Sequence, residues 1–331
     1  MYLSPVELRH MLHKNPELMF KEFESTKVIL ENISKLDGLI IHRPTETGLV
    51  AEYTVNDGDY ILFRADIDAL PIKEETGLEF ASVNGCMHAC GHDVHASILY
   101  GFAEYVSKSR PDKNILFLFQ PGEEGGGGAE KVINTGIFDK FNISKAFAIH
   151  VTDEYPKGTL ASTSGVLFAS AFEIDIEITG KSAHVAFPEN GIHSLDALRR
   201  FLDKTDRLLT EQKERVIFGY GRVESGSVRN IIPAYTRAEC TIRTLSRKKS
   251  QEFLEGLKAK LDEVAAETGI TYKISNGALY SEVNVDDKLF RQLSTSLSKK
   301  YKFIDCGSKM TGEDFGFFSN IYPSMMIWFG T

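Results

Sequence analysis

The chain has 331 residues, of which 42% are hydrophobic and 25% are charged, as is ordinary for globular proteins. No apolar run reaches the roughly 18 residues that a membrane span requires, and the formal net charge is -8 without long basic blocks. Composition therefore argues against a membrane protein and against nucleic acid as the main partner, and a small-molecule partner is expected.

The length exceeds what one hydrophobic core usually serves, which predicts two domains. The first ten residues lack the basic and apolar segments of a secretory signal, which indicates a cytoplasmic protein. Four cysteines, Cys86, Cys90, Cys240 and Cys306, have no framework spacing. In a reducing compartment we expect them to be free or metal-bound thiols without disulfides.

The N-terminal part combines helical and extended patterns. Apolar positions recur at helical spacing within residues 5–36, interrupted by an Asn-Pro pair, which predicts two helices. Two short apolar runs, 48–53 and 60–65, predict strands, and the second leads into Asp66 and Asp68. Because side chains alternate along a strand, these two carboxylates should face the same way beyond the sheet edge.

The densest cluster of reactive side chains lies in residues 87–95, M-H-A-C-G-H-D-V-H, with three histidines, one cysteine and one aspartate. These groups bind zinc, cobalt or manganese, and Cys90 and His92 can both turn toward one ion across Gly91. A lone cysteine or histidine is more often a buried or surface residue without a ligand. Five such groups this close are hard to desolvate without a cation, so the cluster predicts a metal site.

The next elements repeat one arrangement, in which a hydrophobic strand ends in polar residues. A helix follows the histidine cluster, and the apolar run 115–119 then lacks alternation, which suits a strand buried on both faces. Glu123 and Glu124 lie just beyond it, and the later apolar run 146–149 ends at His150. Because ligands of open α/β sheets bind beyond the carboxyl ends of the strands, these side chains should share one rim.

From about residue 168, apolar and acidic residues alternate, which indicates an antiparallel strand with one exposed face. Further periodic segments predict two helices and three strands, at 194–213, 248–267, 216–223, 235–243 and 271–274. The predicted fold class is α/β. Residues 1–167 and 277–331 form a main domain with a largely parallel sheet flanked by helices, and residues 168–276 form an inserted α+β sandwich.

Seven motifs occur in an order that resembles the aminoacylase/carboxypeptidase family of co-catalytic metallopeptidases, metallopeptidase family twenty. They are R-A-D-I-D-A-L-P, M-H-A-C-G-H-D-V-H, Q-P-G-E-E, A-I-H-V, G-K-S-A-H-V-A-F-P, R-N-I-I-P and T-G-E-D-F-G. The match spans nearly the whole chain. Within the family it resembles the amidohydrolase branch that includes hippurate hydrolases, plant auxin-conjugate hydrolases and bacterial N-acetyldiaminopimelate deacetylases, most of all the last.

The resemblance implies that the main domain is catalytic and holds two divalent ions, zinc, manganese, cobalt or nickel. Cys90 would bridge them, with His92, Glu124 and His150 as further ligands, and Glu123 would be the general base. The chemistry agrees with this division. Metal coordination lowers the pKa of water to about 7, and an unligated glutamate can accept its proton and pass it to the leaving amine.

By the same comparison Asp68 would orient one of the metal-binding side chains. Asp66 occupies the position at which other branches of the family carry a metal-binding histidine. The inserted domain would be a lid, in which His184 helps to hold the oxyanion while Asn230 and Arg243 receive the substrate's carboxylate. Without the resemblance, an arginine on a strand, such as Arg243, would be half of a surface ion pair as often as a substrate-binding residue. The neighbouring acids Glu313 and Asp314 are assigned no catalysis, and their simplest role is hydrogen bonding near the metal loop.

The implied function is that of a metal-dependent amidohydrolase acting on an N-acyl amino acid, first of all N-acetyl-diaminopimelate in lysine biosynthesis. The alternatives are a broader, hippurate-type amidohydrolase or dipeptidase, and a non-catalytic metal- or ligand-binding protein that keeps the pocket. A homodimer through the lid and closure of the lid on substrate are further expectations.

The family pattern places one more metal-binding histidine after an apolar strand like residues 325–329, and the sequence ends at Thr331. Four ligands are few for two ions, since a catalytic zinc ordinarily has about three protein ligands. We therefore expect at most one tightly bound ion and slow turnover, unless a longer product supplies the histidine or Asp66 or Asp93 replaces it.

Overall fold

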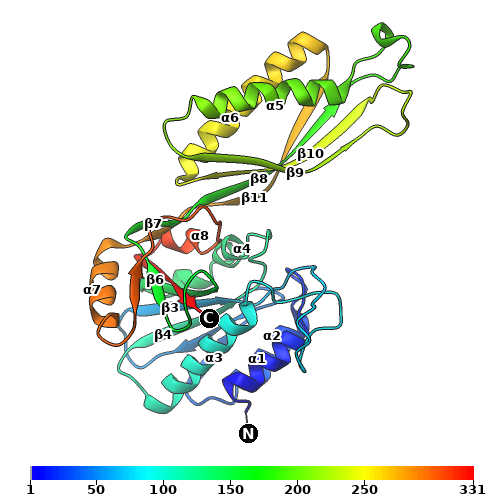
Figure 1. Ribbon diagram of the computed structural model, residues 1–331. Helices are drawn as coiled ribbons and strands as arrows, with labels where there is room; N and C mark the ends of the chain where they lie inside the picture. The colour runs from blue at the N-terminus through cyan, green and yellow to red at the C-terminus, as the bar shows by residue number, and fades with distance from the viewer. Residues whose placement is uncertain (1) are drawn as a thin grey trace. The chain divides into compact units, whose positions relative to one another are not determined.

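The computed structural model describes residues 2–331, and this part of the chain divides into two compact units (Figure 1). The main unit comprises the residues up to Leu167, Val283–Ser308 and Asp314–Thr331, and the inserted unit comprises Phe168–Glu282 and Lys309–Glu313. No helix in the described residues is long and apolar enough to cross a membrane.

The chain returns from the inserted unit later than the sequence pattern indicates. Residue 277, the expected boundary, falls inside β11 (Thr271–Tyr280), whose register with its neighbour shifts between Asn276 and Leu279. Such a bulge interrupts the alternation of side chains, so that the strand looks finished too early in the sequence. The second excursion, Lys309–Glu313, was not expected, because so short a segment carries no periodic pattern.

The main unit is built on an eight-stranded sheet with the order β1-β2-β4-β3-β5-β14-β6-β13. Its strands are β1 (Leu39–His42), β2 (Leu49–Tyr53), β3 (Tyr60–Asp66), β4 (Asn114–Gln120), β5 (Ile143–Thr152), β6 (Leu160–Ser162), β13 (Phe303–Asp305) and β14 (Ser324–Gly330). The neighbours β4, β3, β5 and β14 run parallel to one another, and so do β6 and β13. The predicted, largely parallel sheet is confirmed.

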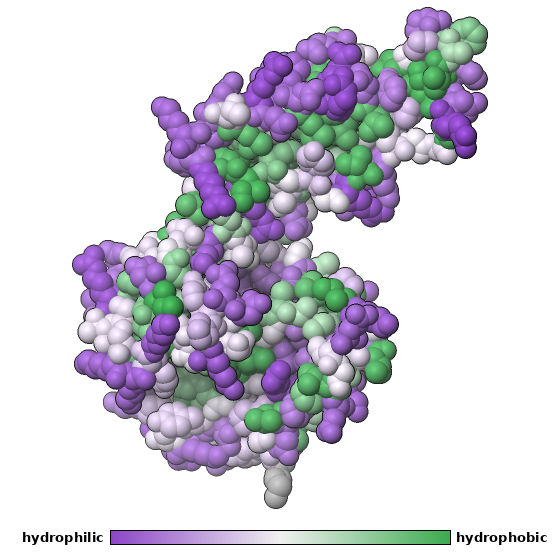
Figure 2. Space-filling view, in the orientation of Figure 1, coloured by the Kyte–Doolittle hydropathy of each residue, from purple (hydrophilic) through white to green (hydrophobic). Residues whose placement is uncertain are grey.

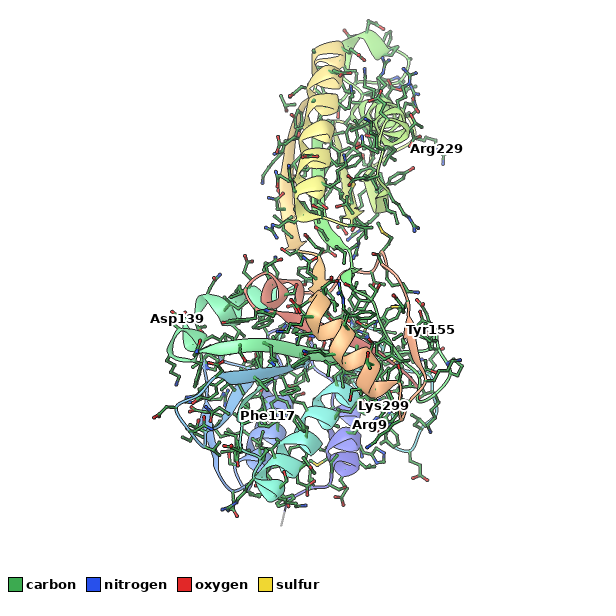
Figure 3. The ribbon with its side chains drawn as sticks, turned by 90° about the vertical axis from the view of Figure 1, so that its left-hand side faces the viewer. Arg9, Phe117, Asp139, Tyr155, Arg229 and Lys299 are labelled. Atoms are coloured by element: carbon green, nitrogen blue, oxygen red, sulfur yellow. The ribbon has the colours of Figure 1, made fainter. Side chains whose placement is uncertain are left out.

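Burial explains why β4 reads as an uninterrupted apolar run. All seven of its residues are buried, and Phe117 lies well inside the main unit while Asp139 lies at its surface (Figure 3).

The helices that surround this sheet are α1 (Pro5–Lys14), α2 (Phe23–Ile33), α3 (His92–Ser109), α4 (Gly128–Asn134), α7 (Asp287–Leu297) and α8 (Gly316–Ser319). The strands β7 (Gly165–Phe168) and β12 (Val283–Val285) form a separate pair.

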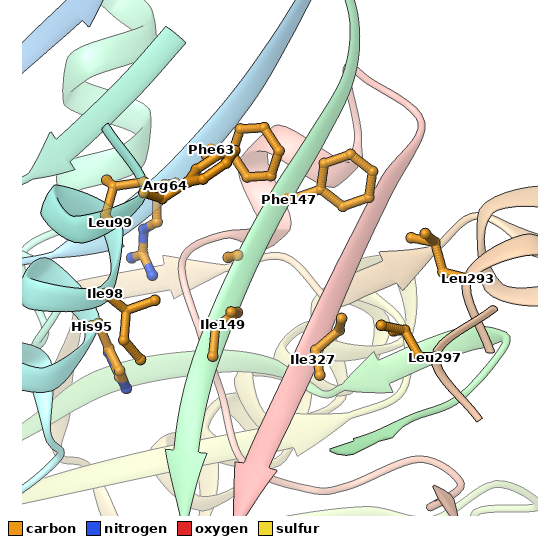
Figure 4. A pocket seen from close by; sticks show the side chains of 12 residues that line it. Phe63, Arg64, His95, Ile98, Leu99, Phe147, Ile149, Leu293, Leu297 and Ile327 are labelled. Carbon is orange, nitrogen blue, oxygen red and sulfur yellow. The ribbon is translucent and has the colours of Figure 1, made fainter. Parts of the chain in front are cut away.

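An apolar cavity of about 450 Å³ lies in the main unit between α3, α7 and the strands β3, β5 and β14 (Figure 4). Most of its wall consists of aliphatic and aromatic side chains, such as Phe63, Phe147 and Leu293. Two polar residues, Arg64 and His95, line it on the α3 side. Both of them also belong to the hydrogen-bond network of the rim described below.

The inserted unit is an antiparallel sheet with the order β11-β8-β10-β9, covered by two helices. The further elements are β8 (Ser170–Thr179), β9 (Val216–Ser225), β10 (Tyr235–Thr244), α5 (Ser194–Thr210) and α6 (Arg247–Thr268). Alternate residues of β8, such as Ile174 and Ile176, are buried against Leu198 and Leu257 of the two helices. The visible surface of this unit is largely hydrophilic, with smaller hydrophobic patches (Figure 2).

Candidate metal centre

The predicted side chains of the main unit gather where β3 and β4 end and α3 begins. The parallel register pairs Asp66 with Gln120 at the ends of the two strands, so that the residues that follow them emerge side by side. The backbone N–H of Glu124 donates to Asp68 Oδ2 over 2.8 Å. Parallel pairing therefore builds the rim that the sequence predicts.

Two tight turns place the ligating side chains. Gly91 precedes α3 with a φ of 82°, and a Cβ there would lie 2.3 Å from Val151 Cγ2. Gly122 has a φ of 68°, and its N–H donates to Glu22 Oε1 over 2.9 Å. Because only glycine adopts such a backbone at low cost, these positions fix where Cys90 and Glu123 emerge.

Cys90, His92 and Glu124 form a compact set of potential metal ligands. One ligand atom from each lies within 4.8 Å of the others. Around the same ring, His92 Nδ1 lies 3.3 Å from Asp68 Oδ1, and His92 Nε2 lies 3.9 Å from Glu123 Oε2. The structure thus brings together five of the residues predicted from sequence.

The polar atoms of this set fit a divalent ion. Both ring nitrogens of His92, Asp68 Oδ1 and Glu124 Oε1 are buried and form no hydrogen bond, since the 3.3 Å contact of His92 with Asp68 is not aligned as one. Buried polar atoms without partners are costly, and coordination of a cation would satisfy them. Imidazole, thiolate and carboxylate are also the ligand types that zinc and its neighbours prefer.

The electrostatics of the cluster favour a cation as well. Burial disfavours the charged form of His92, but the carboxylates of Asp66 and Asp68 outweigh it and hold the pKa of the ring well above its usual value. Burial raises the pKa of the Cys90 thiol and of the Glu124 carboxyl. Several acidic groups thus share one buried site, which a bound divalent cation would stabilise.

In a second group of potential ligands, Asp66, His92 and His95, both Asp66 and His95 are already bonded within the protein. The N–H of Val151 donates to His95 Nε2 over 2.9 Å, so His95 carries its proton on Nδ1 and donates to Asp66 Oδ1 over 2.6 Å. The other oxygen of Asp66 accepts from Arg64 over 2.8 Å. These bonds favour Cys90 over Asp66 as the residue that holds an ion.

Asp93, the other substitute considered for a missing ligand, is bonded to α1. Its Oδ2 accepts from Arg9 Nε over 3.1 Å and lies 2.9 Å from His13 Nδ1. It therefore anchors the start of α3 to the N-terminal helix.

His150 lies near the cluster but outside the compact set. Its Nδ1 donates to the carbonyl of Val151 over 2.7 Å. Its ring centroid is 4.6 Å from that of His95 and 6.3 Å from that of His92. The assignment of His150 as a ligand stays a prediction.

The predicted residues of the inserted unit do not gather at one place. His184 and Asn230 are exposed and adjacent, since the N–H of Val185 donates to the carbonyl of Asn230 over 3.0 Å. Arg243 is half-buried on β10, where it pairs with Ala171 at the start of β8. His184 follows the other end of β8, so the two positions are separated by the length of that strand.

Some residues that shape the site received no individual role from the sequence, although His88 belongs to the predicted histidine cluster. His88 is buried with neither ring nitrogen hydrogen-bonded, and burial lowers its pKa to about 4. Arg64 and Gln120 lie behind the rim and bond to Asp314. A charged residue within the apolar run Y-I-L-F-R-A-D is the one signal that pointed to such a buried partner.

Comparisons with known proteins show which family and which proteins this chain is similar to. A profile of Peptidase family M20/M25/M40 matches residues 62–331. The N-acetyldiaminopimelate deacetylase of Exiguobacterium sibiricum is 37% identical over 98% of this chain and 90% of its own length. That of Shouchella clausii is 34% identical over 98% and 89%. A solved dinuclear metal-binding peptidase of family M20 from Bacillus subtilis is 31% identical, with a TM-score of 0.80 over 99% of this chain and 88% of its own.

Proposed function

This chain belongs to Peptidase family M20/M25/M40, and on that premise we propose that it removes the acetyl group of N-acetyldiaminopimelate. It is a metal-dependent amidohydrolase. The observation that carries the proposal is the compact set Cys90, His92 and Glu124, in which both ring nitrogens of His92 and Oε1 of Glu124 are buried without a hydrogen bond and suit a divalent ion. The names of the two similar deacetylases support the substrate, and with it a place in lysine biosynthesis.

We propose that the site binds two divalent ions, which Cys90, His92, Glu124 and His150 would hold. The second ion would be bound more weakly, because four protein ligands are few for two ions. The dinuclear centre of the similar Bacillus subtilis peptidase supports the number. The ligand types suit zinc, manganese, cobalt or nickel. When bound, such ions supply an acidified water and an electrophilic centre for the acyl carbonyl.

Glu123 is the general base of this proposal. It is buried and lies next to the ligand set without belonging to it, so its carboxylate can accept the proton of the attacking water. The same group then returns the proton to the leaving amine. Asp68 orients the site, because its two oxygens face the His92 ring and the N–H of Glu124.

The inserted unit supplies the groups that meet the substrate, His184 for the oxyanion and Asn230 and Arg243 for the carboxylate. Arg243 pairs with Ala171, and eight residues of strand at about 3.3 Å each place it some 26 Å from the end of β8 that leads to His184. One copy of the unit cannot bring both ends to one small substrate. This separation supports a homodimer in which His184 serves the site of a second copy.

The edge strand β9 is the proposed dimer contact. It ends the sheet order, and its residues Tyr220 and Val223 are 52% and 42% exposed. An exposed strand edge with apolar side chains is a surface to which a second copy can add. None of the four cysteines forms a disulfide in the described part of the chain, which suits the reducing cytoplasm that we assign.

Turnover on a small panel, with metal content measured on the same sample, tests the proposal. We expect hydrolysis of N-acetyldiaminopimelate, its loss on chelation and its return with added metal. A preference for benzoyl amino acids or dipeptides would favour the broader amidohydrolase. Metal binding without turnover on any of them would favour the non-catalytic alternative and contradict the proposal.

A further inference from the structure

A buried network of hydrogen bonds lies behind the rim and takes no part in the chemistry proposed above. Arg64 on β3 has an inaccessible side chain that donates to Gln120 Oε1 over 2.9 Å and to Asp66 Oδ2 over 2.8 Å. Its third bond, of 2.6 Å, goes to Asp314 Oδ1. One guanidinium thus connects the ends of β3 and β4 with a residue far along the chain.

Asp314 is the most heavily bonded carboxylate of this network. Gln120 Nε2 lies 2.9 Å and 2.8 Å from its two oxygens, and the N–H of Ala129 donates to Oδ2 over 2.8 Å. A fully buried ion pair is often no more stabilising than apolar residues of the same volume. Stability alone therefore gives a weak account of why Arg64 and Asp314 are charged.

The backbone of Asp314 reaches the general base. Its N–H donates to Glu123 Oε1 over 3.4 Å, a long bond of the kind that often tightens when substrate binds. Glu123 Oε2 is the oxygen that lies toward His92. The network therefore holds one oxygen of Glu123 from behind, while the other faces the ligand set.

We propose that Asp314 is a positioning residue: its carboxylate, fixed by Arg64 and Gln120, keeps its own N–H on Glu123 and so holds that base in one orientation. The inference rests on the proposed function, because it takes Glu123 as the proton acceptor. Orientation of a reacting group matters strongly, since a displacement of about 1 Å can cost roughly a hundredfold in rate. Asp314 itself is not a member of the ligand set Cys90, His92 and Glu124.

The test compares steady-state kinetics of the metal-loaded full chain with those of Asp314→Asn. We expect kcat to fall between about tenfold and a hundredfold, with KM within about threefold and metal content unchanged. The matched control is Asn114→Asp, at the opposite end of β4, where the buried Asn114 bonds to the backbone of Val55 and Gly58. This control also alters one charge at a buried site, and its kcat should stay at the wild-type value.

A second variant covers the case in which Asp314→Asn does not fold. Gln120→Met removes both bonds from Gln120 to Asp314 but leaves the bond of Arg64 to Asp314, and kcat should fall about fivefold with KM unchanged. Wild-type kcat in either folded and metal-loaded variant would overturn the inference, and so would a loss that only follows metal content. Wild-type turnover in Glu123→Gln would instead contradict the base assignment of the proposed function.

Discussion

The rim of the main unit and the predicted substrate contacts of the inserted unit differ in how they are held. Cys90 and His92 lie on one short segment and Glu123 on another, and buried hydrogen bonds and glycine turns fix both in place. His184 and Asn230 lie on exposed loops, where His184 Nδ1 accepts from the N–H of Ala186 and the carbonyl of Asn230 accepts from the N–H of Val185. Folding alone therefore organises the rim, whereas we propose that the predicted substrate contacts become organised only by substrate or by a second copy.

The largest effect is expected from a substitution at the rim of the main unit, at Glu123. Glu123→Gln removes the proposed proton acceptor and no proposed metal ligand, so kcat should fall by about a hundredfold to ten-thousandfold. Metal content and the unfolding transition should stay as in the wild type. Near-normal turnover would contradict the assignment of Glu123.

The inserted unit offers the next test, because His184 and Arg243 lie at opposite ends of β8. Each single variant, His184→Ala or Arg243→Ala, should lose about a hundredfold in kcat/KM or more. Mixing the two should restore up to about a quarter of wild-type activity, since half of the random dimers then hold one complete site. A mixture no more active than its components would rule out the shared site.

A smaller effect is expected when a ligand is removed. Cys90→Ala should weaken metal binding by at least about tenfold, a loss that even residues behind a ligand commonly cause. The control is Cys240→Ala, which changes a thiol buried in the inserted unit. Full occupancy of Cys90→Ala by elemental analysis would count against a thiolate ligand.

The smallest effect is expected on the outer face of the inserted unit. Arg199 pairs there with Asp196 and Asp203, and its side chain is 62% exposed. Arg199→Ala should change the free energy of unfolding by less than about 1 kcal/mol, because water and salt screen exposed pairs. Asp93→Asn, which disturbs the bonds of Asp93 to α1, should lower the free energy of unfolding by more. Urea titration of both variants and the wild type measures the two changes.

Local patterns predicted much of this molecule. The apolar run of β4, the carboxylates beyond β3 and the histidine stretch that opens α3 each depend on neighbouring residues alone, and the structure places them as expected. Pairings across the chain left no such signal. Arg64 and Asp314 are 250 residues apart, and nothing near either residue identifies its partner.

The same limit applies within the inserted unit. The motifs that contain His184, Asn230 and Arg243 imply that all three bind one substrate. The motifs carry no information on how far apart these residues lie in the folded chain. The register of β8 with β10 separates Arg243 from the other two, and that register is a property of the folded sheet.

The most direct test of the account is anomalous X-ray diffraction from crystals loaded with zinc, since the wavelength dependence of the signal locates the ions. We predict a peak about 2.3 Å from Cys90 Sγ and about 2.0–2.2 Å from ligand atoms of His92 or Glu124. Peaks confined to Asp66 and His95, or an empty rim in protein that turns over substrate, would contradict the claim that Cys90, His92 and Glu124 hold the metal.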